Sequence, residues 1–318
     1  MQNTVKGKII KGVGGLYSVK VLDSDSPLFG SVVNCRAKGA FRHSNVTPLP
    51  GDNVLLLSDS GENGDRKAAE GGFVVAQILD RKNSLIRPPL SNLDYIFVTM
   101  AAAHPTPILT TVDKMISIAE FNDIEPVIVI TKNDLAPDEA EKIADIYKKS
   151  GFTVFVISSV SGEGVDAVRE FVNTALRGKT AAFAGASGIG KSTLMNALFP
   201  SLELFTSDIS RKIERGRHTT RQVELFEISD DADCGYLADT PGFSMLDFER
   251  FNFFEKEDLP LTMREFRPYI GECRYTKCSH TKEQGCAIVE AVKRGDIPRS
   301  RHDSFLEIYE TLKAKKKW

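Results

Sequence analysis

The sequence predicts a multidomain α/β protein: a small β-barrel, then a doubly wound α/β domain, then a helical metal-binding region. Three observations support this prediction. Only short strand patterns occur up to about residue 82, strand and helix patterns alternate from about residue 91, and a Cys/His cluster with two helical patterns follows residue 244. At roughly 100–200 residues per domain, the chain of 318 residues is long enough for two or three domains.

Residues 1–82 are predicted to form the barrel. Turns rich in Gly, Asp and Ser separate apolar or alternating runs at 7–12, 15–22, 31–36, 52–59 and 72–80. This pattern is typical of an OB-like barrel, and an SH3-like barrel would produce the same one. The polar stretch 58–72 is expected to be a loop. Residues 83–90 are expected to be a linker that Pro88 and Pro89 hold extended.

Residues 91–244 are predicted to form the α/β domain, and residues 245–318 the helical one. Strand patterns occupy 94–101, 126–132, 152–159, 180–185 and 234–240. Helical spacing occurs between them, at 110–121, 138–149, 164–177 and 191–199. Such alternation predicts a mostly parallel sheet with helices on its faces. Two more helices are expected near the C-terminus, at about 285–294 and 299–315.

The strand pattern that starts at residue 180 runs into a phosphate-binding loop. The loop matches GxxxxGK[S/T] and comprises Gly185, Ala186, Ser187, Gly188, Ile189, Gly190, Lys191, Ser192 and Thr193. Its glycines let backbone N–H groups curl around a phosphate at a helix N-terminus. We expect Lys191 to bridge the β- and γ-phosphate oxygens and the Ser192 hydroxyl to bind Mg²⁺.

A DTPG segment at 239–242 follows about fifty residues later. Asp239 is expected to supply a carboxylate behind the Mg²⁺ ligands, and the Gly242 N–H to sense the γ-phosphate. Thr219 and Thr220 lie between the two motifs in the basic segment 211–221. One of them, with Thr220 as the working choice, is expected to close over Mg²⁺ when the γ-phosphate is present.

Residues Thr131, Lys132, Asn133 and Asp134 form a base-reading motif and favour GTP over ATP. The Asp134 carboxylate can accept hydrogen bonds from N1–H and the 2-amino group of guanine, whereas adenine would leave it unpaired. The Lys132 stem is expected to lie over the base. Asn is commoner than Thr at position 131, where its amide reaches base N7 and braces the phosphate loop. Ser158 is a candidate for the loop that contacts guanine O6.

The order of these motifs is unusual, because the base-reading motif precedes the phosphate loop. An ordinary Ras-like P-loop GTPase domain has the phosphate loop first, so the domain is predicted to be circularly permuted. Phe243 occupies the position where many GTPases have a water-orienting Gln. His218 is therefore the candidate catalytic residue within the chain, and a group supplied by a partner is the alternative.

Three thiols and an imidazole gather within fourteen positions, at Cys273, Cys278, His280 and Cys286. Thiolates with imidazole suit one structural, tetrahedral Zn²⁺. Five cysteines in all are too few and too unevenly spaced for a secreted disulfide framework.

Composition restricts the possibilities further. The formal net charge of −2 gives no global sign of nucleic-acid binding, although segment 211–221 and the tail 311–318 are locally basic. No apolar run approaches the ~20 residues needed to span a bilayer, and the N-terminus lacks a signal-peptide core. A cytoplasmic, monomeric protein without a membrane partner is expected.

The combined pattern TKND, GASGIGKS, GRHTT, DTPGF and CxxxxCxHxxxxxC, after a small barrel, resembles the circularly permuted ribosome small-subunit biogenesis GTPases of the RsgA or YjeQ family. The resemblance extends to the RPP segment and to GxGGLYxV near the start. It implies an OB-fold, a permuted GTPase domain and a helical zinc domain. It also implies binding to the small (30S) ribosomal subunit and its rRNA, and hydrolysis of GTP to GDP that the particle stimulates. Thr131, where the family usually has Asn, departs from the pattern.

Alternative functions share the nucleotide site. The chain could be a GTP-regulated switch with a non-ribosomal protein partner, or a zinc-containing RNA-binding protein that scarcely hydrolyses GTP. An ATPase is a third alternative, and Asp134 opposes it.

Overall fold

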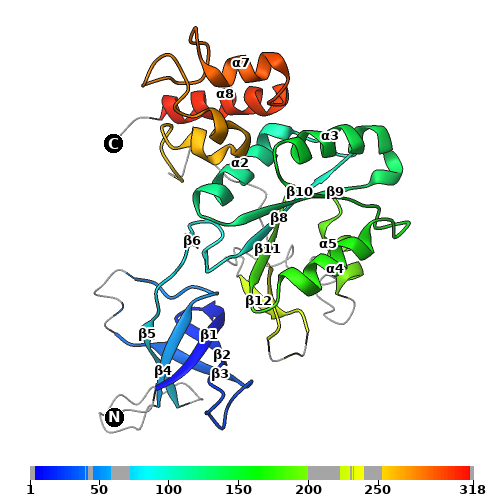
Figure 1. The fold of residues 1–318 in the computed structure, drawn as a ribbon. Coiled ribbons are helices and arrows are strands. Elements are labelled where there is room, and N and C mark those ends of the chain that lie inside the picture. The colour runs from blue at the N-terminus through cyan, green and yellow to red at the C-terminus, as the bar shows by residue number, and fades with distance from the viewer. Residues whose placement is uncertain are drawn as a thin grey trace. The chain divides into compact units, whose positions relative to one another are not determined.

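The computed structural model describes residues 4–39, 41, 46–58, 72–199, 223–229, 231, 233–239 and 253–315 (Figure 1). The chain divides into two compact units. The first contains Met1–Asp94, Leu176–Ala182 and His218–Gly242. The second contains Tyr95–Ala175, Phe183–Arg217 and Phe243–Trp318.

Five strands close into a barrel in the first unit. They are β1 (Thr4–Val13), β2 (Leu16–Val21), β3 (Val32–Ala37), β4 (Asn53–Ser58) and β5 (Phe73–Ile78). β1 pairs with β2 and β4, β2 with β3, β3 with β5, and β5 with β4, so no strand is left unpaired on one side. Alternate side chains point inward and form an apolar core of Ile9, Tyr17, Val19, Cys35, Val54, Leu56 and Val75. All five predicted barrel strands are confirmed.

The segment after the barrel is folded rather than extended. β6 (Ser84–Leu85) and β7 (Leu90–Ser91) pair antiparallel around a turn at 86–89. The Ser91 hydroxyl donates to Asp52 at 2.7 Å, and the Asn92 amide donates to the Gly51 carbonyl at 2.9 Å. Leu90 is fully buried. Burial of its side chain, together with these hydrogen bonds, explains why the expected extended conformation does not occur.

The first unit also contains a hairpin of β12 (Glu224–Glu227) and β13 (Tyr236–Asp239). The sequence analysis predicted β13 but not β12, because a four-residue strand with a glutamate at each end has little β-signal. β12 lies against β1 with Lys11 opposite Glu224. Ion pairs of 2.6 Å (Lys11–Glu224) and 2.8 Å (Lys20–Glu227) reinforce the pairing.

Parallel strands β8 (Tyr95–Ala101), β9 (Glu125–Thr131) and β10 (Thr153–Val156) form the sheet of the second unit. β8 and β9 are buried almost throughout, as expected for parallel strands covered on both faces. Figure 1 shows α2 and α3 on one side of these strands, and α4 and α5 on the other. The four helices are α2 (Leu109–Phe121), α3 (Pro137–Lys149), α4 (Val165–Ala175) and α5 (Lys191–Leu198), which confirms the predicted alternation.

The C-terminal region of the second unit contains two 3₁₀ helices, η3 (Leu259–Thr262) and η4 (Arg264–Tyr269), and two α-helices, α7 (Ala287–Arg294) and α8 (Arg299–Ala314). The 3₁₀ helices were not predicted. Arg301 of α8 is fully buried and forms ion pairs with Asp113 of α2 and, at 2.6 Å, with Glu265 of η4. Tyr147 donates a hydrogen bond of 3.0 Å to the same Asp113. Among the described residues, no helix is both long and apolar enough to cross a bilayer.

Candidate nucleotide site and metal centre

The phosphate loop lies between β11 (Thr180–Ala184) and α5. Gly185, Gly188 and Gly190 all have positive φ angles, which a side chain would disfavour. A Cβ on Gly185 would also clash with the Thr99 carbonyl of β8, so only glycine fits at position 185. The loop residues from Ala186 to Gly188 are exposed, as a phosphate cradle must be.

Lys191 folds back over the loop. Its Nζ donates hydrogen bonds of 2.6 Å to the carbonyls of Gly185 and Ala186. Burial lowers the pKa of Lys191 from its ordinary value. A bound anion beside this ammonium group would oppose that effect and favour the charged form. Ser192 and Thr193 are exposed at the start of α5.

The base-reading motif begins at the carboxyl end of β9. Thr131 is 1% exposed, whereas Asp134 is exposed. Lys132 adopts a left-handed backbone conformation with φ 59°, which turns the chain out of the strand. The Asn133 side chain donates to Glu163 at 3.1 Å. Asp134 is therefore the acidic group that this turn presents to solvent.

Two side chains of this motif hold the phosphate loop. The Thr131 hydroxyl donates a hydrogen bond to the Ile189 carbonyl, and the Lys132 Nζ donates one of 2.8 Å to the Gly188 carbonyl. The two motifs are separated by more than fifty positions in the sequence, yet they lie in hydrogen-bond contact. The predicted meeting of the base half and the phosphate half thus has a direct geometric basis.

A tight loop at 158–164 orients the base-reading carboxylate. Ser158 is fully buried and its hydroxyl donates a 2.6 Å hydrogen bond to Asp134. The backbone of the loop closes through Ser158 N–H to the Glu163 carbonyl at 3.0 Å. The contact of this loop with guanine O6 stays a prediction. The contact of the Ser158 hydroxyl with Asp134 was not predicted.

Several predicted site residues lie outside the described residues. These are His218, Thr219, Thr220 and Gly242, and Phe243 also lies outside them. Asp239 ends β13, and its side chain is likewise outside the described part.

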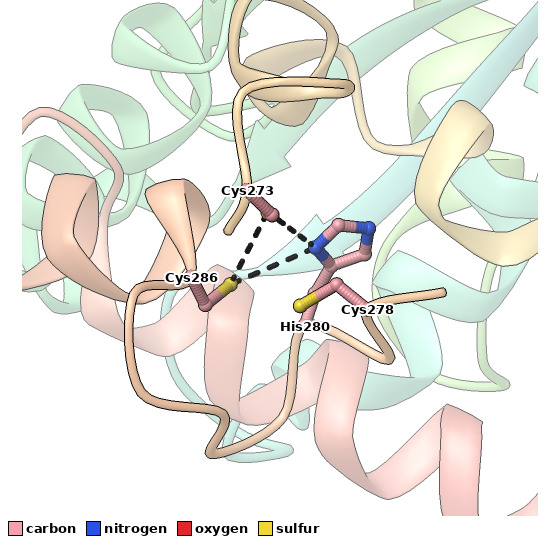
Figure 2. A group of neighbouring side chains, drawn as sticks. All are labelled: Cys273, Cys278, His280 and Cys286. Atoms are coloured by element: carbon pink, nitrogen blue, oxygen red, sulfur yellow. Dashed lines mark hydrogen bonds between the residues drawn. The ribbon is translucent and has the colours of Figure 1, made fainter. Parts of the chain in front are cut away.

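The four predicted metal ligands converge, as Figure 2 shows for Cys273, Cys278, His280 and Cys286. Their ligand atoms all lie within 4.8 Å of one another. The distance between the Cys273 and Cys286 sulfurs is 3.8 Å. His280 Nδ1 lies 3.5 Å from the Cys273 sulfur and 3.6 Å from the Cys286 sulfur.

The three distances among Cys273, His280 and Cys286 fit a zinc ion. Tetrahedral Zn²⁺ with Zn–S bonds of about 2.3 Å and a Zn–N bond of about 2.0–2.1 Å separates its ligand atoms by roughly 3.4–3.8 Å. Burial raises the pKa of the Cys278 thiol to about 12 and lowers that of His280. A bound cation favours the thiolates, and a neutral imidazole has a free lone pair for the metal. The cluster fits one structural zinc ion held by four protein ligands.

Two residues that the sequence analysis missed support this loop. Burial opposes ionisation of Glu283, but hydrogen bonds from the Ser279 hydroxyl and from backbone N–H groups lower its pKa to about 2. Glu283 accepts from the N–H groups of Ser279 at 2.8 Å and Thr281 at 3.0 Å. His302 of α8 lies 2.9 Å from the His280 carbonyl. Such contacts around a metal fix the positions of its ligands.

Comparisons with known proteins agree with this geometry. A family model described as RsgA GTPase matches residues 78–249, and one described as RsgA N-terminal domain matches residues 6–64. The chain belongs to the RsgA GTPase family. The family and the fold class predicted from the motifs are thereby confirmed, and the family is one of GTP hydrolases.

Relatives named RsgA match nearly the whole chain. A Bacillus pumilus protein named small ribosomal subunit biogenesis GTPase RsgA is 40% identical over 316 residues, 98% of each chain. A Ruminiclostridium cellulolyticum protein of the same name is 38% identical and covers 96% of this chain and 93% of its own.

Two crystal structures are similar throughout. YjeQ from Thermotoga maritima has a TM-score of 0.79 and 27% identity, and the match covers 99% of this chain and 100% of YjeQ. YloQ, described as a circularly permuted GTPase, has a TM-score of 0.74 and 32% identity, with 99% and 97% covered. The permuted arrangement inferred from motif order therefore has a solved counterpart.

Proposed function

We propose that this protein binds GTP between its phosphate loop and its base-reading motif and hydrolyses it on the small (30S) ribosomal subunit during late maturation of that particle. The observation that carries the proposal is the contact of Thr131 and Lys132 with the phosphate loop. It supports a single site to which the Asp134 carboxylate and the Lys191 ammonium group both contribute. The small ribosomal subunit is proposed as the partner because the relatives are named small ribosomal subunit biogenesis GTPases.

Each site residue has a chemical role in this proposal. Asp134 accepts from guanine, Lys191 neutralises the β- and γ-phosphates, and Ser192 provides a hydroxyl ligand for the Mg²⁺ that accompanies GTP. His218 orients the attacking water, since Phe243 has no group that can do so. One of Thr219 and Thr220 closes over the metal ion.

The remaining parts of the chain serve binding to the particle. The barrel and the basic segment 211–221 contact rRNA phosphates, and the zinc ion stabilises the loop that carries it. The protein acts in the cytoplasm as a monomer, with GTP and GDP as its small-molecule ligands.

The test is the rate of GTP hydrolysis with and without purified small subunits. We expect slow hydrolysis alone and a large increase on the particle. Lys191→Ala should abolish both rates, and Lys142→Ala, an exposed lysine of α3, should change neither. His218→Ala should remove the stimulated rate and leave GTP binding intact.

Two outcomes would contradict the proposal. Unchanged hydrolysis with saturating particles would favour a GTP-regulated switch with another partner. Tight binding to RNA with no hydrolysis under single-turnover conditions would favour a zinc-containing RNA-binding protein.

A further inference from the structure

We propose that this chain recognises guanine through its Watson–Crick edge alone, without a hydrogen bond from Thr131 to N7, because the Thr131 hydroxyl is used to hold the phosphate loop. The inference rests on the proposed GTP site and states how that site reads the base. It makes Thr131 a positioning residue for the phosphate loop rather than a base contact.

The hydrogen-bonding capacity of Thr131 is the first step. A threonine hydroxyl has one proton to donate. The Thr131 oxygen is within hydrogen-bonding distance of the Ile189 carbonyl and lies 3.2 Å from the Met100 carbonyl. Carbonyls only accept, so the proton is committed to the main chain. N7 of guanine is also an acceptor and would need a proton that this hydroxyl has already donated.

The burial of the side chain is the second step. Thr131 is 1% exposed, enclosed between β8 and the phosphate loop. Asp134, three residues later, is exposed.

The other side chains of the motif also bond to the protein. Lys132 donates to the carbonyls of His104 and Gly188. The Asn133 amide donates one proton to Glu163 at 3.1 Å. Asp134 can only accept, and Ser158 holds one of its oxygens at 2.6 Å. The motif therefore offers guanine an acceptor for N1–H and the 2-amino group, while the hydroxyl of Thr131, the residue at the position expected to reach N7, has no proton left to donate.

Two nucleotide analogues distinguish a contact with N7 from contacts with the Watson–Crick edge of guanine. 7-Deaza-GTP replaces N7 by a C–H group and keeps the Watson–Crick edge. Inosine triphosphate keeps N7 and lacks the 2-amino group. Affinities of the zinc-loaded full-length protein can be measured for each, with Mg²⁺, by competition against a fluorescent GDP analogue.

For the wild type we expect GTP and 7-deaza-GTP to bind within about twofold of each other, since no hydrogen bond is lost. Inosine triphosphate should bind roughly ten- to a hundredfold more weakly, because one hydrogen bond to a carboxylate is lost. A preference of more than about fivefold for GTP over 7-deaza-GTP would overturn the inference while leaving the GTP site intact. Failure to bind either nucleotide would instead overturn the proposed function.

Substitutions of Thr131 test the same point from the protein side. An Asn amide has two protons, so Thr131→Asn can hold the Ile189 carbonyl and also reach N7. It should create a preference for GTP over 7-deaza-GTP of roughly three- to tenfold. Thr131→Val should lower the affinities for GTP and 7-deaza-GTP equally. Thr131→Ser, which keeps the hydroxyl, should retain both affinities.

Thr262→Val is the matched control. Thr262 is 2% exposed and its hydroxyl donates to the Leu259 carbonyl at 2.8 Å, so the chemical change and the burial are the same. It should leave both affinities unchanged. A loss in Thr131→Val confined to GTP would show that the hydroxyl contacts N7, and the inference would be wrong. If Thr131→Val does not fold, the wild-type comparison of GTP with 7-deaza-GTP decides the matter alone.

Discussion

Arg301 is the largest fully buried side chain among the described residues, and its charge is matched on two sides. Asp113 and Glu265 bind its guanidinium, and Tyr147 completes the set by bonding Asp113. Removing one partner of such a cluster leaves the others buried and uncompensated, which costs more than the net gain from the pair itself. The C-terminal helix is thereby fixed to the helix that follows β8.

Arg301→Met should destabilise the protein by about 3–5 kcal/mol, because two carboxylates lose their counter-charge in a buried site. Urea unfolding of the zinc-loaded protein measures the change. Arg299→Met is the control, since Arg299 lies two positions away on α8 with a side chain that is 82% exposed. Equal urea midpoints for Arg301→Met and Arg299→Met would show that the buried cluster does not contribute to the free energy of unfolding.

Ser158 and Ser159 are adjacent, and only one of them is bonded to the base-reading residue. Ser158→Ala should weaken GTP binding roughly tenfold or more, because a hydrogen bond to a carboxylate is lost. Ser159→Ala should change affinity by less than about twofold, because its buried hydroxyl has no hydrogen-bond partner among the residues that the structure describes. Calorimetric titration with GDP distinguishes the two. A similar loss in both variants would mean that the loop as a whole, rather than the Ser158 hydroxyl, supports the carboxylate.

At the scale of elements, the Cys/His loop depends on one carboxylate as well as on its four ligands. Glu283 holds three backbone N–H groups of the loop, those of Ser279, Thr281 and Lys282. Glu283→Ala should therefore lower zinc affinity by about 10–100-fold. Competition with a chromophoric chelator measures it. Glu290→Ala on the neighbouring helix α7, which removes only an exposed pair with Lys293, should have no effect.

Most elements could be predicted from the sequence because their signals are local. The barrel strands alternate, the helices have 3.6-residue spacing, and the glycines of the phosphate loop follow a fixed pattern. β12 and the β6–β7 hairpin were missed because their stability comes from partners distant in sequence, such as Lys11 and Asp52. The Arg301 cluster was missed for the same reason, since a lone arginine in a helical pattern is usually exposed.

The candidate site shows the same division. Phosphate, guanine and zinc each demand particular atoms at particular spacings, so candidate residues for all three could be named from the sequence; the convergence of the four zinc candidates is confirmed, and the nucleotide contacts stay predictions. The hydrogen bonds from Thr131 to the phosphate loop and from Ser158 to Asp134 are contacts between loops that are distant in sequence. No spacing in the sequence reports such contacts.

At the scale of the whole molecule, binding to the small subunit and binding of GTP should respond differently to salt. If the protein neutralises six or more rRNA phosphates, its affinity for the particle should fall by roughly a thousandfold between 50 and 200 mM salt. GTP affinity should change much less over that range. Sedimentation with purified subunits measures the first and nucleotide competition the second. A flat salt response of particle binding would indicate a ribosomal protein as the main contact.

The attachment of α8 to α2 has a mechanical consequence. α2 directly follows β8 and precedes β9, the strand that ends in the base-reading turn. A macromolecule bound to the Cys/His loop would apply force to α8 and, through the Arg301–Asp113 ion pair, to α2 and the strands on either side of it. Tension applied near the C-terminal helix would thus be transmitted to the turn that carries Asp134 and, through the hydrogen bonds of Thr131 and Lys132, to the phosphate loop.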